Sequence, residues 1–304
     1  MNILETQSLS RRFGRTEAVH DLTFALPAGS VCALLGPNGA GKSTTIKLLM
    51  NLLHPTSGHA RVLGVDSQRL GPSQLAQIGY VSENQQLPTW MTVRQFLDYC
   101  RPFYPTWDRA LESTLLKRFD LPEARKLKHL SRGMLMKAAL LSSLAYRPRL
   151  LILDEPFSGL DPVVRDDFVQ GLLEAAQAGE WSALISSHDI DEVERLADRV
   201  ALLETGRLRV DETTESLLGR FRRIEIDLQG GAARLHDLPA AWIGQEQAGG
   251  RIRLVDTQYF PGPTEALCRR HFPDAAVTAH RMTLRDIFVS LARANTPANA
   301  EALR

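Results

Sequence analysis

A glycine-rich stretch between an apolar run and a helical pattern restricts the fold of this chain more than any other feature. The run Val31-Cys32-Ala33-Leu34-Leu35 predicts a buried strand, and the pattern over residues 45–53 predicts a helix. The stretch between them reads Gly36-Pro37-Asn38-Gly39-Ala40-Gly41-Lys42-Ser43-Thr44. Glycines let backbone N–H groups surround a phosphate chain, and the positive end of the helix dipole points to the same place. We therefore expect a phosphate-binding loop, with Lys42 on the β- and γ-phosphates and the Ser43 hydroxyl on Mg²⁺.

The alternative is a chance match to the pattern G-x-x-x-x-G-K-[ST] in an ordinary turn between a strand and a helix. At average residue usage the pattern arises by accident in roughly one chain of this length per hundred, and the flanking strand and helix lower that frequency further. We interpret residues 36–44 as a nucleotide phosphate site and call them the P-loop.

Composition fits a large globular domain with a smaller accessory piece. The chain has 304 residues, of which 44 % are hydrophobic, and its formal net charge is +1. This charge, with no long block of like charges, argues against the electrostatic footprint of a nucleic-acid binder. The three cysteines, Cys32, Cys100 and Cys268, are an odd number without C-x-x-C spacing, which argues against a disulfide framework or a zinc site and favours a reducing compartment.

The sequence shows no sign of a membrane-inserted segment. Residues 1–5 lack the basic segment followed by an apolar stretch that marks a signal peptide, so we expect none. Apolar runs also stay well short of the roughly 18 residues that a membrane span requires. If the protein works at a membrane, we expect another chain to supply the membrane part.

The order of the predicted elements indicates an α/β fold with a parallel sheet. Residues 3–26 read as antiparallel strands and turns. Beyond the P-loop helix, strands are predicted at 60–65, 78–81, 150–153, 182–187 and 200–203, and helices at 162–178 and 190–197. Strands that alternate with helices in units of about 25 to 35 residues imply right-handed βαβ crossovers.

Two regions depart from this alternation. Residues 89–147 predict an inserted helical block, in which Thr92 and Gln95 form a capping box, a second helix covers 108–119 and a third begins at Ser131. Beyond about residue 220 the pattern predicts a small α+β unit, with strands at 224–228, 252–254 and 277 and helices at 263–271 and 283–294. We accordingly predict domains at 1–219 and 220–294 and a disordered tail at 295–304.

An acidic pair follows the apolar run at 150–153. Asp154 stands at the end of that strand, where nucleotide chemistry needs a carboxylate for Mg²⁺. Glu155 comes next and is placed to polarise a water for in-line attack on the γ-phosphate, so we assign it the role of general base. The alternative is an acidic pair solvated at a sheet edge, which the upstream P-loop makes the weaker interpretation.

Taken together, these motifs resemble those of ATP-binding cassette (ABC) ATPases, the nucleotide-binding subunits of ABC transporters. The resemblance extends over about residues 3–218 and includes two further motifs, the D-loop Ser158-Gly159-Leu160-Asp161 and the switch-histidine motif Ser186-Ser187-His188-Asp189. Phe13 stands where the family has an aromatic residue that stacks on adenine. The resemblance implies a P-loop NTPase fold with an antiparallel β subdomain and an inserted helical subdomain. It also implies that His188 senses the γ-phosphate and that Asp161 couples two nucleotide sites.

The chain departs from the family pattern in its signature segment. The usual Leu-Ser-Gly-Gly-Gln appears as Leu130-Ser131-Arg132-Gly133-Met134. In the family this segment presents a helix N-terminus, a serine hydroxyl and glycine backbone to the γ-phosphate held by the opposite subunit. Ser131 and Gly133 keep those features, whereas Arg132 and Met134 alter the side-chain contacts.

A second departure is Glu83, which stands where many members have a glutamine that contacts the metal and links to the membrane subunit. A carboxylate at this position can ligate Mg²⁺ or a water bound to it. Gln85 or Gln86 is an alternative for that role, and a plain loop glutamate is another.

The resemblance implies an ATP-hydrolysing subunit that uses ATP and Mg²⁺ and forms a head-to-tail dimer, with itself or with another ABC ATPase subunit. Its further implied partners are separate transmembrane permease subunits, at the cytoplasmic face of the cell membrane. The variant signature and the aromatic segment at 103–108 resemble a bacterial subgroup with exporter-type permeases, although packing is the alternative role for those aromatics.

Two rival functions stay open. One is a soluble ABC ATPase acting on nucleic acid or the ribosome, but the long coiled-coil insertion or second cassette common in those families is missing from the sequence. The other is a non-hydrolysing regulatory subunit, against which the presence of Glu155 and His188 argues.

Overall fold

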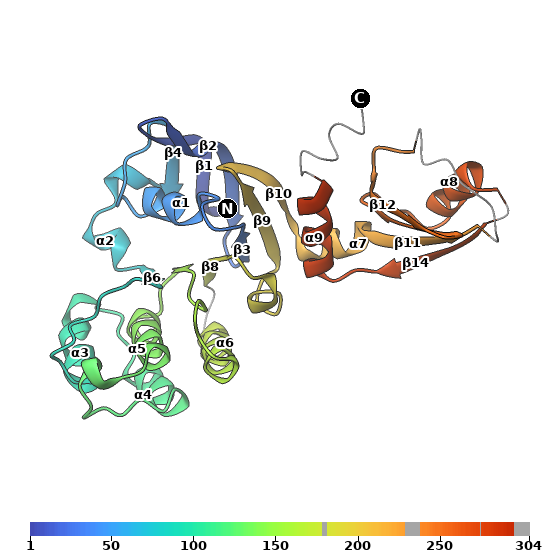
Figure 1. Cartoon of the computed structure of the whole chain (residues 1–304). Coiled ribbons are helices and arrows are strands. Elements are labelled where there is room, and N and C mark those ends of the chain that lie inside the picture. The colour runs from blue at the N-terminus through green and yellow to red at the C-terminus, as the bar shows by residue number, and fades with distance from the viewer. Residues whose placement is uncertain (178–180, 229–237, 274, 295–304) are drawn as a thin grey trace. The chain divides into compact units, whose positions relative to one another are not determined.

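In the computed structural model the chain forms two compact units, Met1–Asp211 and Glu212–Arg304 (Figure 1). The structure describes residues 1–177, 181–228, 238–273 and 275–294, so the predicted disordered tail at 295–304 lies outside the described residues. The second unit begins at Glu212 rather than at the predicted residue 220. The earlier boundary arises because helix α7 (Thr214–Arg220) contacts helix α9 (Leu284–Ala294) and Arg220 donates a hydrogen bond to the Thr257 carbonyl.

An antiparallel sheet opens the first unit, as the sequence predicts for residues 3–26. Its strands are β1 (Asn2–Phe13), β2 (Thr16–Pro27), β4 (Ser57–Val62) and β5 (Val65–Asp66), in the order β2-β1-β4-β5. Apolar side chains of β1, β2 and β4 pack with Ile46 and Leu49 of helix α1 (Lys42–Leu49) in one buried cluster. Burial of this cluster fixes the P-loop helix against the sheet.

The second sheet of this unit is mainly parallel and has the order β10-β9-β3-β8-β7-β6. Its strands are β3 (Val31–Leu35), β6 (Ile78–Ser82), β7 (Leu150–Asp154), β8 (Ser182–Ser187), β9 (Arg199–Glu204) and β10 (Arg207–Thr213). Every residue of β7 and β8 is buried, as expected for strands covered on both faces. Because β3 and β6 to β9 run in parallel, the loops that follow them meet at one edge of the sheet.

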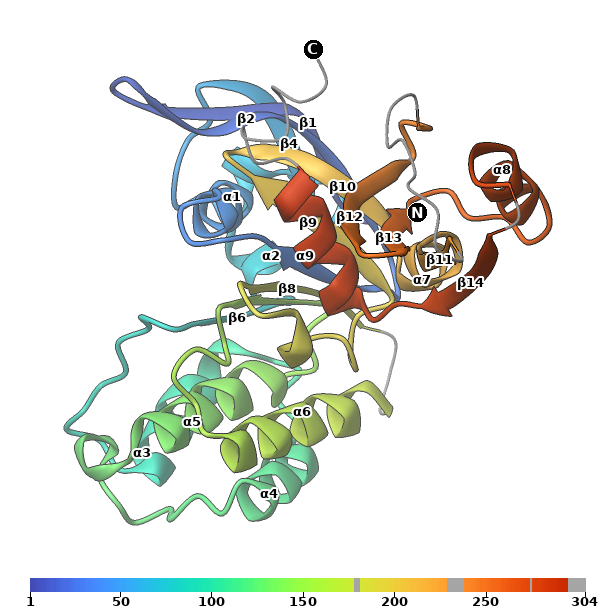
Figure 2. The same cartoon turned by 45° about the vertical axis from the view of Figure 1, so that its right-hand side comes forward.

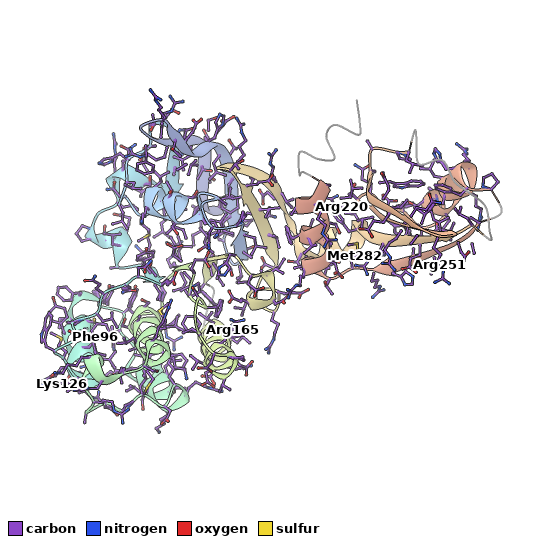
Figure 3. All side chains as sticks on the ribbon, viewed as in Figure 1. Phe96, Lys126, Arg165, Arg220, Arg251 and Met282 are labelled. Atoms are coloured by element: carbon purple, nitrogen blue, oxygen red, sulfur yellow. The ribbon has the colours of Figure 1, made fainter. Side chains whose placement is uncertain are left out.

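The helical block contains the three predicted helices, α3 (Val93–Cys100), α4 (Arg109–Arg118) and α5 (Arg132–Leu144). The Thr92–Gln95 capping box is present, and Phe96 of α3, labelled in Figure 3, is buried. Helix α6 (Pro162–Gln177) contacts α4 and α5 (Figure 2), so the helical layer includes a helix from outside residues 89–147. Among the described residues, no helix combines the length and apolar character that crossing a membrane requires.

The aromatic segment at 103–108 serves mainly for packing. Tyr104 stacks on Tyr146 with ring centroids 3.8 Å apart, and the Trp107 indole N–H donates to the buried Glu112 carboxylate at 2.6 Å. Phe103 is exposed, and its one ring contact among the described residues is an edge-to-face contact with the exposed Tyr99. One aromatic side chain of the segment thus faces solvent, while its neighbours hold the helical block together.

The second unit is a small α+β fold, as predicted. Its antiparallel sheet has the order β12-β13-β11-β14, formed by β12 (Trp242–Ala248), β13 (Arg251–Asp256), β11 (Arg222–Asp227) and β14 (Ala276–Arg281). Cys268 of helix α8 (Pro263–His271) and Phe272 pack on the apolar side chains of the sheet. Arg251, at the start of β13, and Met282, after β14, are labelled in Figure 3.

Strands β10 and β12 and helix α7 were missed by the sequence prediction, and the helix predicted at 190–197 was wrong. Strand β12 escaped prediction because only its first residue, Trp242, is buried; the turn at 249–250 joins it to β13. The helix predicted at 190–197 is a 3₁₀ turn over Ile190–Glu192 followed by separate turns. The Glu192 carboxylate bonds back to the Ser187 hydroxyl at 2.6 Å, which fixes the segment against the strand end.

Asp108→Ala should destabilise the helical block by removing the cap of α4. The Asp108 carboxylate accepts hydrogen bonds from the backbone N–H groups of Ala110 and Leu111 and pairs with Arg147 at 2.7 Å. The bond from Leu111, with the Arg147 guanidinium, holds the pKa of Asp108 below its usual range. We expect the free energy of unfolding at pH 7, measured in urea, to fall by about 1–2 kcal/mol.

The difference in free energy of unfolding between the wild type and Asp108→Ala should depend on pH. Because the folded-state pKa of Asp108 is lowered, its stabilisation is fully present above the unfolded aspartate pKa of about 3.9 and is lost as the pH falls through the folded-state value. The difference in free energy of unfolding between the wild type and Asp108→Ala should therefore shrink as the pH falls below about 3.9. Asp108→Asn keeps a capping oxygen and should lose less stability; equal losses for the two variants would contradict the capping role.

Candidate functional site

Four loops at the carboxyl edge of the parallel sheet bring most of the predicted site residues together. The P-loop follows β3, Glu83 follows β6, Glu155 follows β7 and His188 follows β8. These strands are neighbours in the order β3-β8-β7-β6. Ligand sites in α/β proteins form at this edge because the strand ends leave several loops beside one another.

The P-loop backbone needs glycine at two of its positions. A Cβ on Gly36 would lie 2.3 Å from the Leu203 carbonyl oxygen, and one on Gly41, where φ is +102°, would lie 2.4 Å from that of Ala18. Gly41 is also the N-cap of α1, which begins at Lys42 rather than at the predicted residue 45. Lys42, Ser43 and Thr44 thus form the first helical turn, whose N–H groups have no intrahelical partner and suit a phosphate.

The Lys42 ammonium group is buried and held on several sides. Its side chain is only 5 % exposed, and Nζ donates to the carbonyl oxygens of Gly36 at 2.6 Å and Pro37 at 3.2 Å. It also lies 3.0 Å from Glu155 Oε1. The cation is therefore both neutralised and oriented by the loop that it serves.

Glu155 links Lys42 to His188. Its second carboxylate oxygen, Oε2, lies 2.8 Å from His188 Nδ1, and its side chain is 12 % exposed. The backbone of Glu155 has φ of +51°, a left-handed conformation that is strained for a residue with a Cβ, and its N–H donates to the Ser186 hydroxyl at 2.9 Å. These constraints fix the carboxylate between an ammonium and an imidazole.

Asp154 and Ser43 make the part of the site that fits Mg²⁺. The buried Asp154 Oδ1 accepts hydrogen bonds from Ser43 Oγ at 2.9 Å and from Ser186 Oγ at 2.8 Å. Oxygen ligands of this kind suit Mg²⁺, which usually takes one or two carboxylates and completes its shell with water and substrate phosphates. The described residues include no group of three or more acidic, histidine or cysteine side chains that could hold a metal ion.

The Glu83 carboxylate contacts the signature segment and the D-loop. Glu83 Oε1 accepts hydrogen bonds from Arg132 Nη2 at 2.6 Å and from Ser158 Oγ at 2.9 Å. Its backbone N–H donates to the Asp154 carbonyl at 3.0 Å. The metal contact expected of Glu83 stays a prediction, and the observed partners of its carboxylate are Arg132 and Ser158.

Ser131, Gly133 and Asp161 have local structural roles. Ser131 is the N-cap of α5 and accepts a hydrogen bond from the Met134 N–H at 3.2 Å, while the buried Gly133 packs against Val164. Asp161 accepts from the Val164 N–H at 2.9 Å at the start of α6. Their contact with the nucleotide of a second chain stays a prediction.

Phe13 lies at the end of β1, with its side chain 44 % exposed. The Arg11 guanidinium carbon lies 4.6 Å from the centre of its ring. One face of the ring is therefore engaged by a cation, and stacking on adenine stays a prediction for the side chain.

The sequence analysis missed a buried polar network behind His188. Glu192 accepts from Ser187 Oγ at 2.6 Å and pairs with Arg165, labelled in Figure 3, at 3.0 Å. Burial raises the pKa of the Glu192 carboxyl. The network anchors the end of β8 next to His188, and Ser186, on the same strand, anchors Asp154 and Glu155. The one sequence signal for this network is the pair of serines, Ser186 and Ser187, at the end of an otherwise apolar strand.

Comparison with known proteins gives consistent matches. A family model described as ABC transporter matches residues 19–158, which include the P-loop, the signature segment and the Asp154-Glu155 pair. The ABC transporter ATP-binding protein YtrB of Bacillus subtilis is 30 % identical over 220 residues, covering 71 % of this chain and 75 % of that protein. The sulfate/thiosulfate import ATP-binding protein CysA of Salmonella typhi is 32 % identical over 277 residues, covering 88 % and 75 %.

A solved structure of an ATP-binding subunit of an ABC transporter has a similar fold. Its TM-score with this chain is 0.64 at 29 % sequence identity, and the match covers 71 % of this chain and 91 % of that one. The fold likeness thus extends well beyond the P-loop.

Ser186→Ala should destabilise the nucleotide-free protein by about 1–3 kcal/mol, because it removes the buried hydroxyl that serves both Asp154 and the Glu155 N–H. The matched control is Ser182→Ala at the other end of β8, which loses one bond between neutral groups, from the Gly29 N–H. Urea denaturation measures both. A loss for Ser186→Ala no greater than that of the control would contradict the anchoring role.

Proposed function

We propose, from the premise that this chain belongs to the ABC transporter family of ATP-binding proteins, that its site hydrolyses ATP to power a separate membrane permease. The family and the fold show that the chain is an ATP-binding subunit of an ABC transporter. The observation that supports hydrolysis is the arrangement of Glu155, which lies 3.0 Å from Lys42 and 2.8 Å from His188 beside the Ser43–Asp154 pair.

In this proposal the phosphates of ATP bind at the first turn of α1. Lys42 is the cation that contacts the β- and γ-phosphates, and its move toward them frees Oε1 of Glu155. The freed oxygen accepts a proton from the water that attacks the γ-phosphorus, and the bond from that phosphorus to the bridging oxygen breaks so that ADP leaves. His188 keeps the Glu155 carboxylate in place through Oε2. Ser43 and Asp154 would hold Mg²⁺, which would neutralise charge on the phosphate oxygens.

A second chain completes the site. Ser131 and Gly133 stand at the N-terminus of α5, which favours a negatively charged partner, and in our proposal they contact the γ-phosphate held by the opposite subunit. Since only ATP carries the γ-phosphate, ATP but not ADP stabilises the closed dimer. Asp161, at the start of α6, is the residue we propose to couple the two sites. The second chain is another copy or a related ABC ATPase subunit.

The relatives and the signature segment point to different directions of transport. The variant signature favours an exporter in our reading, whereas the named relatives include import ATP-binding proteins such as CysA. The proposal therefore concerns the ATPase at the cytoplasmic face of the membrane, and the exporter subgroup stays a prediction. A permease encoded beside this chain and purified with it would identify the partner.

Glu155→Gln should separate binding from hydrolysis. We expect ATP affinity to be retained, turnover to fall by about 10²- to 10⁴-fold, and an ATP-dependent dimer to accumulate on size-exclusion chromatography. Glu225→Gln in the second unit, where the carboxylate pairs with Arg253, is the control and should keep wild-type turnover. Near-normal turnover in Glu155→Gln would exclude it as the general base, and absence of ATPase activity in the wild-type dimer would favour a non-hydrolysing regulatory subunit.

Lys42→Ala should weaken ATP binding by about 10- to 100-fold, because a charge-assisted bond to phosphate contributes about 1.5–3 kcal/mol. Lys47→Ala is a matched control, since Lys47 lies on the same helix and is exposed. Equilibrium binding of a fluorescent ATP analogue measures both variants. Equal affinities for the two would show that the buried ammonium does not contact the nucleotide.

A further inference from the structure

The two residues that depart from the family pattern in charge, Glu83 and Arg132, contact each other directly. The distance between Arg132 Nη2 and Glu83 Oε1 is 2.6 Å, and the same glutamate oxygen accepts a hydrogen bond from the Ser158 hydroxyl at 2.9 Å. Three segments far apart in the sequence meet here, namely the loop after β6, the first turn of α5 and the D-loop. We call Glu83, Arg132, Ser158 and Gly159 the Glu83 cluster.

The absence of a side chain on Gly159 leaves room for the Arg132 guanidinium group. The backbone of Gly159 has φ of +68°, and a Cβ on it would lie 2.8 Å from Arg132 Nη1 and 3.0 Å from Cζ. The guanidinium group therefore lies directly against the D-loop backbone, where any larger residue would displace it. The position of the ion pair therefore depends on the space that Gly159 leaves as well as on the opposite charges.

The position of Arg132 explains why it needs a partner. It is the first residue of α5, at the positive end of the helix dipole, where a cation is disfavoured. The Glu83 carboxylate supplies the opposing charge with a short charge-assisted hydrogen bond. Without it, Arg132 would be repelled from the turn that carries Ser131 and Gly133.

The cluster is also joined to the catalytic strand. The Glu83 N–H donates to the Asp154 carbonyl at 3.0 Å, so the residue that pairs with Arg132 is bonded to the backbone between β7 and Glu155. Within the first unit, the start of α5 and the end of β7 are thereby connected through one residue.

We propose that Arg132 is a positioning residue for ATP turnover that acts through Glu83. The pair fixes the start of α5 and the D-loop relative to the carboxylates that follow β7, and Glu83 serves as the counter-charge of Arg132 rather than as a metal ligand. This inference rests on the proposed ATPase function.

A double-mutant cycle in the full chain tests the proposal, with Arg132→Ala, Glu83→Ala, both together, and the charge-reversed pair Glu83→Arg with Arg132→Glu. We expect each single variant to lower kcat by roughly 3- to 10-fold with ATP affinity changed less than about twofold. The double variant should be no slower than the slower single variant, and the reversed pair should recover part of the rate. Arg109→Ala, at the exposed first position of α4 in the same helical block, is the matched control and should keep wild-type kcat.

Salt and Mg²⁺ titrations give readouts that a merely structural role would not move. Because the Arg132 and Glu83 side chains are 52 % and 30 % exposed, added salt should lower the wild-type kcat and leave that of the double variant less affected. Additive losses in the cycle would overturn the proposal. So would a Glu83→Ala variant that needs more Mg²⁺ while Arg132→Ala does not, because that pattern identifies a metal ligand.

Amide hydrogen exchange separates failure of this inference from failure of the proposed function. If the wild-type chain hydrolyses no ATP, the proposed function fails. The effect of the Glu83–Arg132 pair can still be measured as the exchange rates of the N–H groups of residues 83 and 135, which donate to the carbonyl oxygens of Asp154 and Ser131. Faster exchange at both in each single variant, with no further increase in the double variant, supports the positioning pair. Unchanged exchange overturns it.

Discussion

The burial of the Lys42 ammonium is the constraint on which the site depends. A cation this far from water is stable only with opposite charge and hydrogen-bond acceptors beside it. Two P-loop carbonyls and the Glu155 carboxylate provide them. The carboxylate that neutralises the lysine is the group proposed to accept the water proton, so one interaction both stabilises the loop and holds the base. A phosphate that replaces the carboxylate as the partner of Lys42 changes both at once.

This arrangement requires strands β3, β7 and β8 to be neighbours, because each supplies one member of the chain Lys42–Glu155–His188. The parallel sheet brings these residues together although they are far apart in the sequence, because crossover connections place the carboxyl ends of the strands at one edge. Burial of β7 and β8 on both faces makes their register firm, and polar residues at their ends then hydrogen-bond across the strands.

The sequence was sufficient for the features that leave a local pattern. The P-loop, the buried strands, the capping box at Thr92 and the helix at 263–271 are readable because glycine spacing, apolar runs and cap residues each act over a few positions. Contacts between distant segments leave no such pattern, which is why the partners of Ser186, Glu192 and Glu83 were not anticipated. The edge strand β12 was missed for a related reason, since an exposed strand has little hydrophobic alternation to detect.

The left-handed backbone at Glu155 places stability and activity in opposition. Glycine or asparagine adopts such a conformation at lower cost than glutamate does, so replacement at this position relaxes the backbone while removing the carboxylate. If Glu155 is the proposed general base, a selection for heat resistance alone would favour replacements at this position that lower ATP turnover. Under that proposal, a glutamate in this strained turn lowers the folding stability of the chain while it supplies the carboxylate that turnover requires.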